Sequence, residues 1–204
     1  MLVIGAGVVG LFCAYFLRQR GATVTVIERG EVGGPGSCSY GNTGFVGTQG
    51  SAPLAEPGVM TQGLRWLADP QSPFYIKPRL DPGLVSWLWQ FRRFCNERSV
   101  QEVFGVLLAM KKRSLEILTG LCAPGNPCAS GDLAATFTAP GIVVAHKTPE
   151  SFEKARRSVP RMVALGLPLR VLAAGELAAL SPDAEFDISG ALINSEGAAL
   201  HVPE

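Results

Sequence analysis

The stretch LVIGAGVVGLF, residues 2–12, decides how the start of this chain folds. It lies inside a run from Met1 to Leu17 that carries no charged side chain, so the run is either a membrane anchor or a buried strand that turns into a helix. The first positive residues, Arg18 and Arg20, follow the run, whereas a secretory signal carries positive charge before its apolar part. A membrane helix needs about 20 apolar residues, and this run is shorter and interrupted by glycines. These features favour a strand and a helix.

The three glycines of this stretch have separate roles in that interpretation. Gly5 makes the tight turn that follows the strand Leu2–Ile4. Gly7 lets backbone N–H groups approach a pyrophosphate, and Gly10 lets the helix pack close to the strand. We expect the helix over residues 8–20, because two arginines and a glycine mark its end.

A second strand, Thr23–Ile27, is rich in β-branched residues and is followed by Glu28. An acidic side chain in this position, roughly 20 residues past the glycines, accepts hydrogen bonds from an adenosine ribose. Strand, glycine turn, helix, strand and acid in this order indicate a dinucleotide-binding βαβ unit. The carboxylate lies where a 2′-phosphate would sit and disfavours NADP, although Arg29 is adjacent to it.

Composition excludes several other classes of function. Lys and Arg number 18 against 17 for Asp and Glu, so no overall field attracts the chain to nucleic acid, and we expect no nucleic-acid partner. Five cysteines in no CxxC pair and two histidines argue against a zinc site, and we expect no metal. The spacing of Cys122 and Cys128 permits a disulfide, but free thiols in a reducing cytosol are the favoured interpretation.

Glycine spacing alone leaves NAD and FAD as alternatives. The segment GEVGGPGSCSYGNTGFVG, residues 30–47, contains seven glycines and no helix or strand pattern before Phe45. A plain NAD-type unit would continue with a second helix here, and composition by itself would favour a surface loop.

Three stretches carry a family resemblance over essentially the whole chain. They are VIGAGVVGLFCAYFLRQRGATVTVIERG, then SCSYGNTG, then PLAEPGVMTQGLRWLADPQSPFYIKPRLDPGLVSWLWQFRRFCN. Together they resemble the N-terminal half of the D-amino-acid dehydrogenase branch of the FAD-dependent amino-acid oxidase family, to which glycine oxidase and sarcosine oxidase are related. The segment SYGNTG, residues 39–44, matches the family's Ser-aromatic-Ala-Asn-Ala-Gly motif beside the flavin, with Gly41 and Thr43 in place of the alanines.

The resemblance implies that FAD is the cofactor and that a set of backbone turns and polar side chains binds it. The implied residues are Gly5, Gly7, Val8, Val9, Gly10, Glu28, Arg29, Ser39, Asn42 and Gly44. The glycines would line the pyrophosphate, and Glu28 would bind the adenosine ribose with Arg29 beside it. Ser39, Asn42 and Gly44 would pass close to the ribityl chain or the isoalloxazine.

The resemblance also implies an activity, the oxidation of the C–N bond of D-amino acids by hydride transfer to flavin, which yields 2-oxo acids and ammonia. Electrons would then pass to a quinone or another acceptor, in the cytoplasm or at the inner face of the cell membrane. Trp66, Trp87 and Trp89 beside a basic edge suit contact with a membrane surface. Amine oxidation of sarcosine, glycine or hydroxyproline, an NAD-dependent enzyme and a non-catalytic dinucleotide-binding module stay open, and so does the oligomeric state.

The predicted fold class is α/β. We expect an incomplete Rossmann-like FAD-binding domain over residues 1–124 and the start of an α+β substrate domain over residues 125–204. Further helices are predicted at 59–68, 82–96, 100–121, 149–165 and 175–180, and strands at 74–76, 133–138, 142–145, 169–172 and 190–194. The strands at 133–138 and 142–145 are expected to pair as a hairpin about Pro140-Gly141.

No catalytic residue is identified in the sequence. His146 and His201 are the only imidazoles, and neither has a serine or cysteine partner at a recognisable spacing. Only two parallel strands of a Rossmann sheet are visible, and the resemblance places the substrate-binding arginine and the tyrosines near the flavin beyond residue 204. We therefore expect the 204 residues alone to oxidise no D-amino acid.

Overall fold

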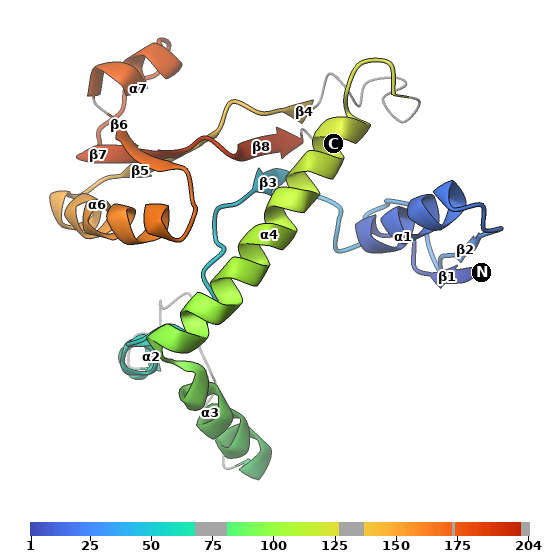
Figure 1. The fold of residues 1–204 in the computed structure, drawn as a ribbon, viewed down its shortest axis with the longest axis horizontal. Helices are drawn as coiled ribbons and strands as arrows, with labels where there is room; N and C mark the ends of the chain where they lie inside the picture. The colour runs from blue at the N-terminus through green and yellow to red at the C-terminus, as the bar shows by residue number, and fades with distance from the viewer. Residues whose placement is uncertain (68–80, 127–136, 173, 201–204) are drawn as a thin grey trace. The chain divides into compact units, whose positions relative to one another are not determined.

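The computed structural model describes residues 1–67, 81–126, 137–172 and 174–200 (Figure 1). Contacts between residues divide this part of the chain into two compact units. The first unit contains residues 1–45, 137–138 and 199–200, and the second contains residues 46–67, 81–126, 139–172 and 174–198.

The first unit begins with two parallel strands joined by a helix, as the sequence predicts. β1 (Leu2–Ile4) lies parallel to β2 (Thr25–Ile27), and α1 (Val8–Gln19) packs against both strands. β2 begins two residues later than predicted, and α1 ends just before Arg20 and Gly21. This β1–α1–β2 unit is the expected Rossmann-like opening.

A second sheet has the strand order β3-β8-β4. Its members are β3 (Phe45–Gly47), β8 (Gly197–Leu200) and β4 (Phe137–Thr138). β4 and β8 run antiparallel, with Phe137 opposite Leu200. The chain therefore returns to the neighbourhood of its predicted flavin motif, since the Leu200 N–H donates to the Gly44 carbonyl at 2.9 Å.

The predicted hairpin about Pro140-Gly141 is wrong. β5 (Ile142–His146) pairs antiparallel with β7 (Gly190–Asn194) along all five residues, and β4 pairs with β8 instead. β5 thus joins the sheet of β7, whereas the two described residues of β4 belong to the sheet of β8. The turn instead connects strands of different sheets, and its Gly141 N–H donates to the Gly197 carbonyl at 3.0 Å.

The third sheet forms the centre of the second unit. Its order is β5-β7-β6, with β6 (Leu169–Leu172) antiparallel to the central β7. α7 (Ala174–Leu180) contributes Leu177 to a core that also contains Leu172, Ala191 and Ile193. β7 has a strand on each edge, α6 packs against it, and its Ala191, Leu192 and Ile193 are buried.

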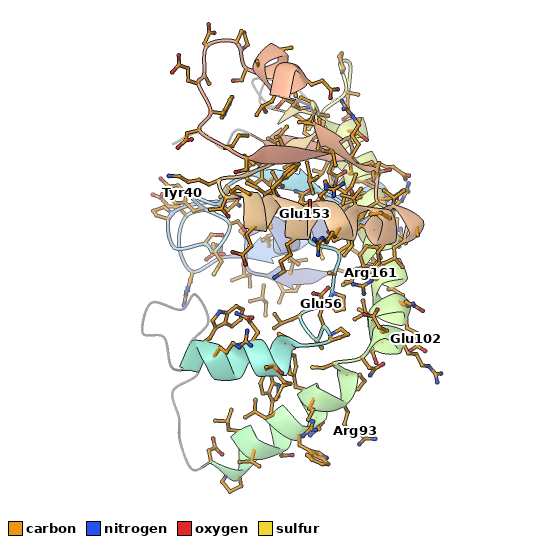
Figure 2. All side chains as sticks on the ribbon, turned by 90° about the vertical axis from the view of Figure 1, so that its left-hand side faces the viewer. Tyr40, Glu56, Arg93, Glu102, Glu153 and Arg161 are labelled. Carbon is orange, nitrogen blue, oxygen red and sulfur yellow. The ribbon has the colours of Figure 1, made fainter. Side chains whose placement is uncertain are left out.

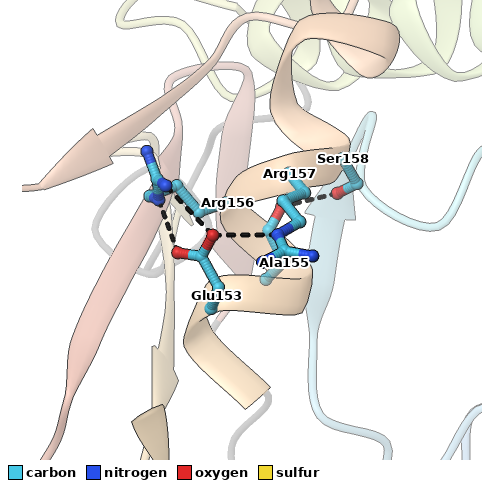
Figure 3. Close-up of polar contacts among 5 residues, drawn as sticks. All are labelled: Glu153, Ala155, Arg156, Arg157 and Ser158. Carbon is cyan, nitrogen blue, oxygen red and sulfur yellow. Dashed lines mark hydrogen bonds and ion pairs between the residues drawn. The ribbon is translucent and has the colours of Figure 1, made fainter. Parts of the chain in front are cut away.

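α6 (Pro149–Ala164) packs against this sheet and begins where the sequence predicts. The Thr148 hydroxyl accepts a hydrogen bond from the Ser151 N–H at 3.2 Å, which caps the helix. On the outer face, Glu153 lies between Arg156 and Arg157 at 2.8 and 2.9 Å (Figure 3). Hydrogen bonds from these guanidinium groups lower the pKa of Glu153 to about 2, but the pairs are exposed and contribute little to stability.

Three further helices precede this sheet in the chain: α2 (Val59–Leu67), α3 (Pro82–Phe94) and α4 (Glu97–Leu121). α3 ends two residues earlier and α4 begins three residues earlier than predicted. The reason is Asn96, whose side chain accepts the Ser99 N–H at 3.0 Å and starts α4 directly after a short turn.

α4 shares a core with the connection between α6 and β6. Phe104 and Leu108 of α4 pack with Leu167, and all three side chains are buried. α6 and α4 also form an ion pair, in which Arg161 of α6, labelled in Figure 2, donates to Glu97 at the start of α4 at 2.7 Å. Contacts thus divide the chain after Phe45, whereas the predicted division between FAD-binding and substrate-binding parts follows residue 124. That functional boundary stays a prediction.

A buried polar network fixes the segment that follows β3. Thr48, Ser51 and Asn194 are each at most 2% exposed. The Asn194 amide donates to the Thr48 hydroxyl at 2.9 Å, and its carbonyl oxygen accepts the Glu196 N–H at 3.0 Å. Lys111 of α4 donates to the carbonyl oxygens of two successive residues in the same segment, both at 2.7 Å. The turn after β3 is therefore held by β7 and by α4.

No helix in the described part of the chain is long and apolar enough to cross a membrane. The run from Met1 to Leu17 accordingly forms β1, the glycine turn and most of α1. The predicted strand at 74–76, Cys128 and His201 lie outside the described residues.

Candidate functional site

The candidate site is built on the turn between β1 and α1. The Gly5 N–H donates to the Ile27 carbonyl at 2.8 Å, which ties the turn to the end of β2. Gly7 is the residue before α1 and has no side chain to cap the helix. The first N–H groups of α1 therefore need partners from outside the helix.

Gly10 allows α1 to approach β1 closely. A Cβ atom on Gly10 would lie 1.9 Å from the Gly5 carbonyl oxygen and 3.5 Å from the Val3 side chain. Contact between real atoms at 1.9 Å is impossible, so only glycine fits here without a shift of the helix. This is the close helix–strand packing that the glycine spacing predicts.

The segment of residues 36–39 lies over the start of α1. The Ser39 hydroxyl accepts the Val8 N–H at 3.0 Å, and the Ser37 hydroxyl accepts the Ser39 N–H at 3.1 Å. A Cβ atom on Gly7 would meet these two hydroxyls at 3.2 and 3.4 Å. Both serines thus place polar oxygens around the N-terminus of α1, where a phosphate group is favoured by the N–H groups and the helix dipole.

Glu28 is fixed by backbone N–H groups at the end of β2. One carboxylate oxygen accepts the Ala6 N–H at 2.6 Å, and the other accepts the N–H groups of Arg29 and Gly30 at 2.8 and 3.1 Å. These hydrogen bonds lower the pKa of Glu28, and the one from the Ala6 N–H has the largest effect. The side chain is therefore an ionised acceptor beside the glycine turn.

These residues line one groove of about 700 Å³ within the first unit. The groove is lined by Val3, Ile4, Gly5, Gly7, Val8, Val9, Gly10, Cys13, Ile27, Glu28, Arg29, Gly36, Ser37, Cys38 and Ser39. It brings together every residue that was predicted to bind the cofactor except Asn42 and Gly44.

Asn42 and Gly44 shape the loop next to the groove and do not line it. The Asn42 amide donates to the Ser39 carbonyl at 2.8 Å, and its oxygen accepts the Gly44 N–H at 2.7 Å. Gly44 has a φ of +65°, and a Cβ atom there would lie 1.9 Å from the Leu200 carbonyl oxygen. The motif thus ties the loop that contains Ser39 to β8. Contact of Asn42 and Gly44 with a flavin stays a prediction.

The sequence did not indicate Cys13, Gly36, Ser37 or Cys38 as lining residues. Cys13 follows Gly10 by three residues, about one helical turn, so its place on the same side of α1 was accessible from the sequence. The position of residues 36–38 depends on contacts with α1 that span about thirty residues of chain, such as that between Val8 and Ser39. No local pattern carries such information.

His146 has a serine neighbour that the sequence did not reveal. Its Nδ1 lies 2.9 Å from the Ser151 hydroxyl, and its Nε2 is buried without a hydrogen-bond partner among the described residues. Without a carboxylate on Nε2 the pair lacks the orienting group of a catalytic triad.

In the described residues, no three His, Cys, Asp or Glu side chains gather to hold a metal ion.

The groove fits a dinucleotide by its chemistry. A partly exposed glycine turn and the N-terminus of α1 suit a pyrophosphate, and an ionised carboxylate at the end of β2 suits the hydroxyls of a ribose. The close contact at Gly10 holds the start of α1 against the Gly5 carbonyl, so the glycine turn and the helix N-terminus lie together at one side of the groove.

Comparisons with known proteins agree with this chemistry. The family model described as FAD dependent oxidoreductase matches residues 1–204. D-amino acid dehydrogenase 2 of Ralstonia nicotianae is 37% identical over 180 residues, which cover 88% of this chain and 41% of that protein. D-amino acid dehydrogenase of Vibrio atlanticus is 36% identical over 121 residues, which cover 59% of this chain and 29% of that protein.

A solved structure has the same fold at low sequence identity. Glycine oxidase from Geobacillus kaustophilus superimposes with a TM-score of 0.51 at 18% identity, covering 98% of this chain and 40% of that one. The chain thus spans about two fifths of the length of that structure and of the Ralstonia relative.

Proposed function

Because this chain belongs to the family of FAD-dependent oxidoreductases, we propose that its complete gene product is an FAD-dependent dehydrogenase of D-amino acids. The reaction oxidises the C–N bond of the amino acid and, with one water, yields a 2-oxo acid and ammonia. The observation that carries the proposal is the groove around the glycine turn, with Gly10 against β1 and Glu28 at the end of β2. The substrate class rests on the names of the two relatives that are at least 36% identical.

Each part of the groove has a proposed role toward FAD. Gly5, Gly7 and Gly10, with the N–H groups of Val8 and Val9, hold the pyrophosphate. This requires the phosphate to replace or join the Ser39 hydroxyl at the Val8 N–H. When bound, FAD supplies the acceptor for the two electrons of the substrate.

Glu28 and Arg29 form the proposed adenosine end of the site. The lowered pKa of Glu28 keeps its carboxylate ionised, so it accepts hydrogen bonds from ribose hydroxyls and donates none. Ser39, Asn42 and Gly44 are proposed for the flavin end, where Asn42 fixes the loop that carries Ser39.

We assign no catalytic residue to this chain. We propose residues 1–124 as the FAD-binding part and residues 125–204 as the first part of the substrate-binding domain.

The proposal predicts a yellow protein that D-amino acids bleach. We expect the complete gene product to release FAD on heating and to reduce an electron-accepting dye with D-amino acids, while their L-enantiomers serve as the control. The 204-residue chain by itself should show no such reduction. Dye reduction with sarcosine, glycine or hydroxyproline but with no D-amino acid would replace this proposal by the related amine-oxidase activity. A protein that binds NAD and no FAD would overturn it.

We further propose a quinone as electron acceptor and α3 as a contact with the cytoplasmic face of the membrane. No residue of α3 is buried, and Trp87 and Trp89 are 48% and 64% exposed. At 3.6 residues per turn, Val85 and Trp89 share one side of the helix, with Arg92 and Arg93 on its two flanks (Figure 2 labels Arg93). An apolar side edged by arginines suits an anionic lipid surface. Trp66 is half-buried and lends less support.

Sedimentation with lipid vesicles tests the membrane contact. The complete gene product should bind vesicles that contain anionic phosphatidylglycerol, and the double variant Val85→Ser, Trp89→Ser should bind several-fold less. Val106→Ser, at a 60% exposed position of α4, is the matched control and should bind like the parent. Equal binding by all three proteins, or none by any, would refute a role for α3.

A further inference from the structure

Two of the described cysteines lie in the proposed cofactor groove. Cys13 belongs to α1 and Cys38 to the segment over the start of α1, and both thiols are free and exposed. We propose that Cys13 and Cys38 form a thiol modification site at which a soft electrophile and FAD exclude each other. The inference rests on the proposed FAD function and adds a means by which occupancy of the groove is regulated.

The two thiols border the groove from different segments. Cys38 lies between Ser37 and Ser39, whose hydroxyls surround Gly7 and accept the Val8 N–H. Cys13 lines the groove about one helical turn beyond Gly10, the residue at which α1 approaches β1 closely. An adduct on either sulfur therefore takes up space in the groove that the proposed cofactor requires.

The chemistry needs no further reactant. The sulfur of a thiolate adds to the carbon–carbon double bond of an electrophile such as a maleimide. A C–S bond forms, the π bond breaks, and the neighbouring carbon takes a proton from water. The adduct is covalent and bulky, so a modified protein stays closed to FAD when free reagent has been removed.

The other described cysteines provide an internal control. Cys122 is buried, and Cys95 is half-buried with its Sγ donating to the Phe91 carbonyl at 3.3 Å. Burial raises the pKa of both thiols, which lowers the fraction of the reactive thiolate. Cys13 and Cys38 should therefore react first, and Cys95 and Cys122 should report general unfolding.

The first test is a labelling experiment on the complete gene product that carries this sequence. FAD-free and FAD-loaded samples receive a short pulse of N-ethylmaleimide, and peptide mass spectrometry gives the labelling rate of each cysteine. We expect FAD to slow labelling of Cys13 and Cys38 at least tenfold and to leave the slow rates of Cys95 and Cys122 unchanged. Equal rates for Cys13 and Cys38 with and without bound FAD would overturn the proposal.

The reverse test measures FAD binding after labelling. FAD-free protein labelled at Cys13 and Cys38 should bind FAD at least tenfold more weakly in a fluorescence titration than its untreated sample. In the double variant Cys13→Ser, Cys38→Ser, treatment with N-ethylmaleimide should not change the affinity relative to the same variant untreated. If this variant does not fold, the wild-type comparison still decides the matter, because unchanged FAD affinity of the labelled protein contradicts the proposal. Failure of the untreated wild-type protein to bind FAD would instead refute the cofactor assignment, and this inference with it.

Discussion

Replacing Gly10 with alanine should sharply weaken both FAD binding and the stability of the first unit. The new Cβ atom would lie 1.9 Å from the Gly5 carbonyl oxygen, so α1 must move away from β1 to accept it. Overpacking of this kind typically costs about 1–3 kcal/mol. If the cost falls on the bound form, FAD affinity drops roughly fivefold to over a hundredfold. Fluorescence titration with FAD and thermal unfolding measure the two effects.

Gly105→Ala is the matched control for this substitution. Gly105 lies in the middle of α4, and a Cβ atom there meets no atom within 4 Å. Alanine favours a helix over glycine by about 1 kcal/mol, so this variant should bind FAD normally and unfold at the same or a slightly higher temperature. If Gly10→Ala behaves like Gly105→Ala, the close approach of α1 to β1 is wrong.

Replacing Phe104 with alanine should give the largest loss of stability in the second unit. Phe104 is 1% exposed and packs with Leu108 and Leu167 in the core shared by α4 and the connection between α6 and β6. Removing a buried phenyl ring costs about 3–5 kcal/mol because it leaves a cavity. The free energy of unfolding in urea, measured on the complete gene product, gives the value.

Val106→Ala on the same helix separates packing from helix propensity. Val106 is 60% exposed, so its substitution should change the free energy of unfolding by no more than about 0.5 kcal/mol. A loss at Phe104 as small as that at Val106 would mean that α4 does not share a core with Leu167.

The sequence predicted best those parts of the site whose geometry depends on neighbouring residues. Gly5, Gly7 and Gly10 specify the turn and the close packing of α1, because helix and strand follow one another directly in the chain. Glu28 was also placed correctly at the end of β2, beside the turn. Its hydrogen bond to the Ala6 N–H was not predicted, since it depends on the side-chain conformation of a residue 22 positions away.

The errors share a physical cause, which is that a local pattern does not specify the partner of a strand or a side chain. Residues 142–145 have the pattern of a strand, but the pattern does not tell whether β4 or β7 is the neighbour, and the structure pairs β5 with β7. Asn96 was assigned to the end of a helix although its side chain caps the start of the next one. The proximity of His146 and Ser151 follows from the turn between β5 and α6, which sequence spacing alone did not reveal.

The network of Thr48 and Asn194 has a consequence for synthesis of the chain on the ribosome. The two residues are 146 positions apart, and at about 5–20 residues per second the ribosome needs about 7–30 s to add that many. Throughout that interval the Thr48 hydroxyl cannot yet accept the hydrogen bond from the Asn194 amide. The second unit therefore stays incomplete during this interval. Phe104 and Leu108 likewise lack their core contact until Leu167 has been added. Chaperones that bind exposed apolar segments have their longest opportunity at this stage of translation.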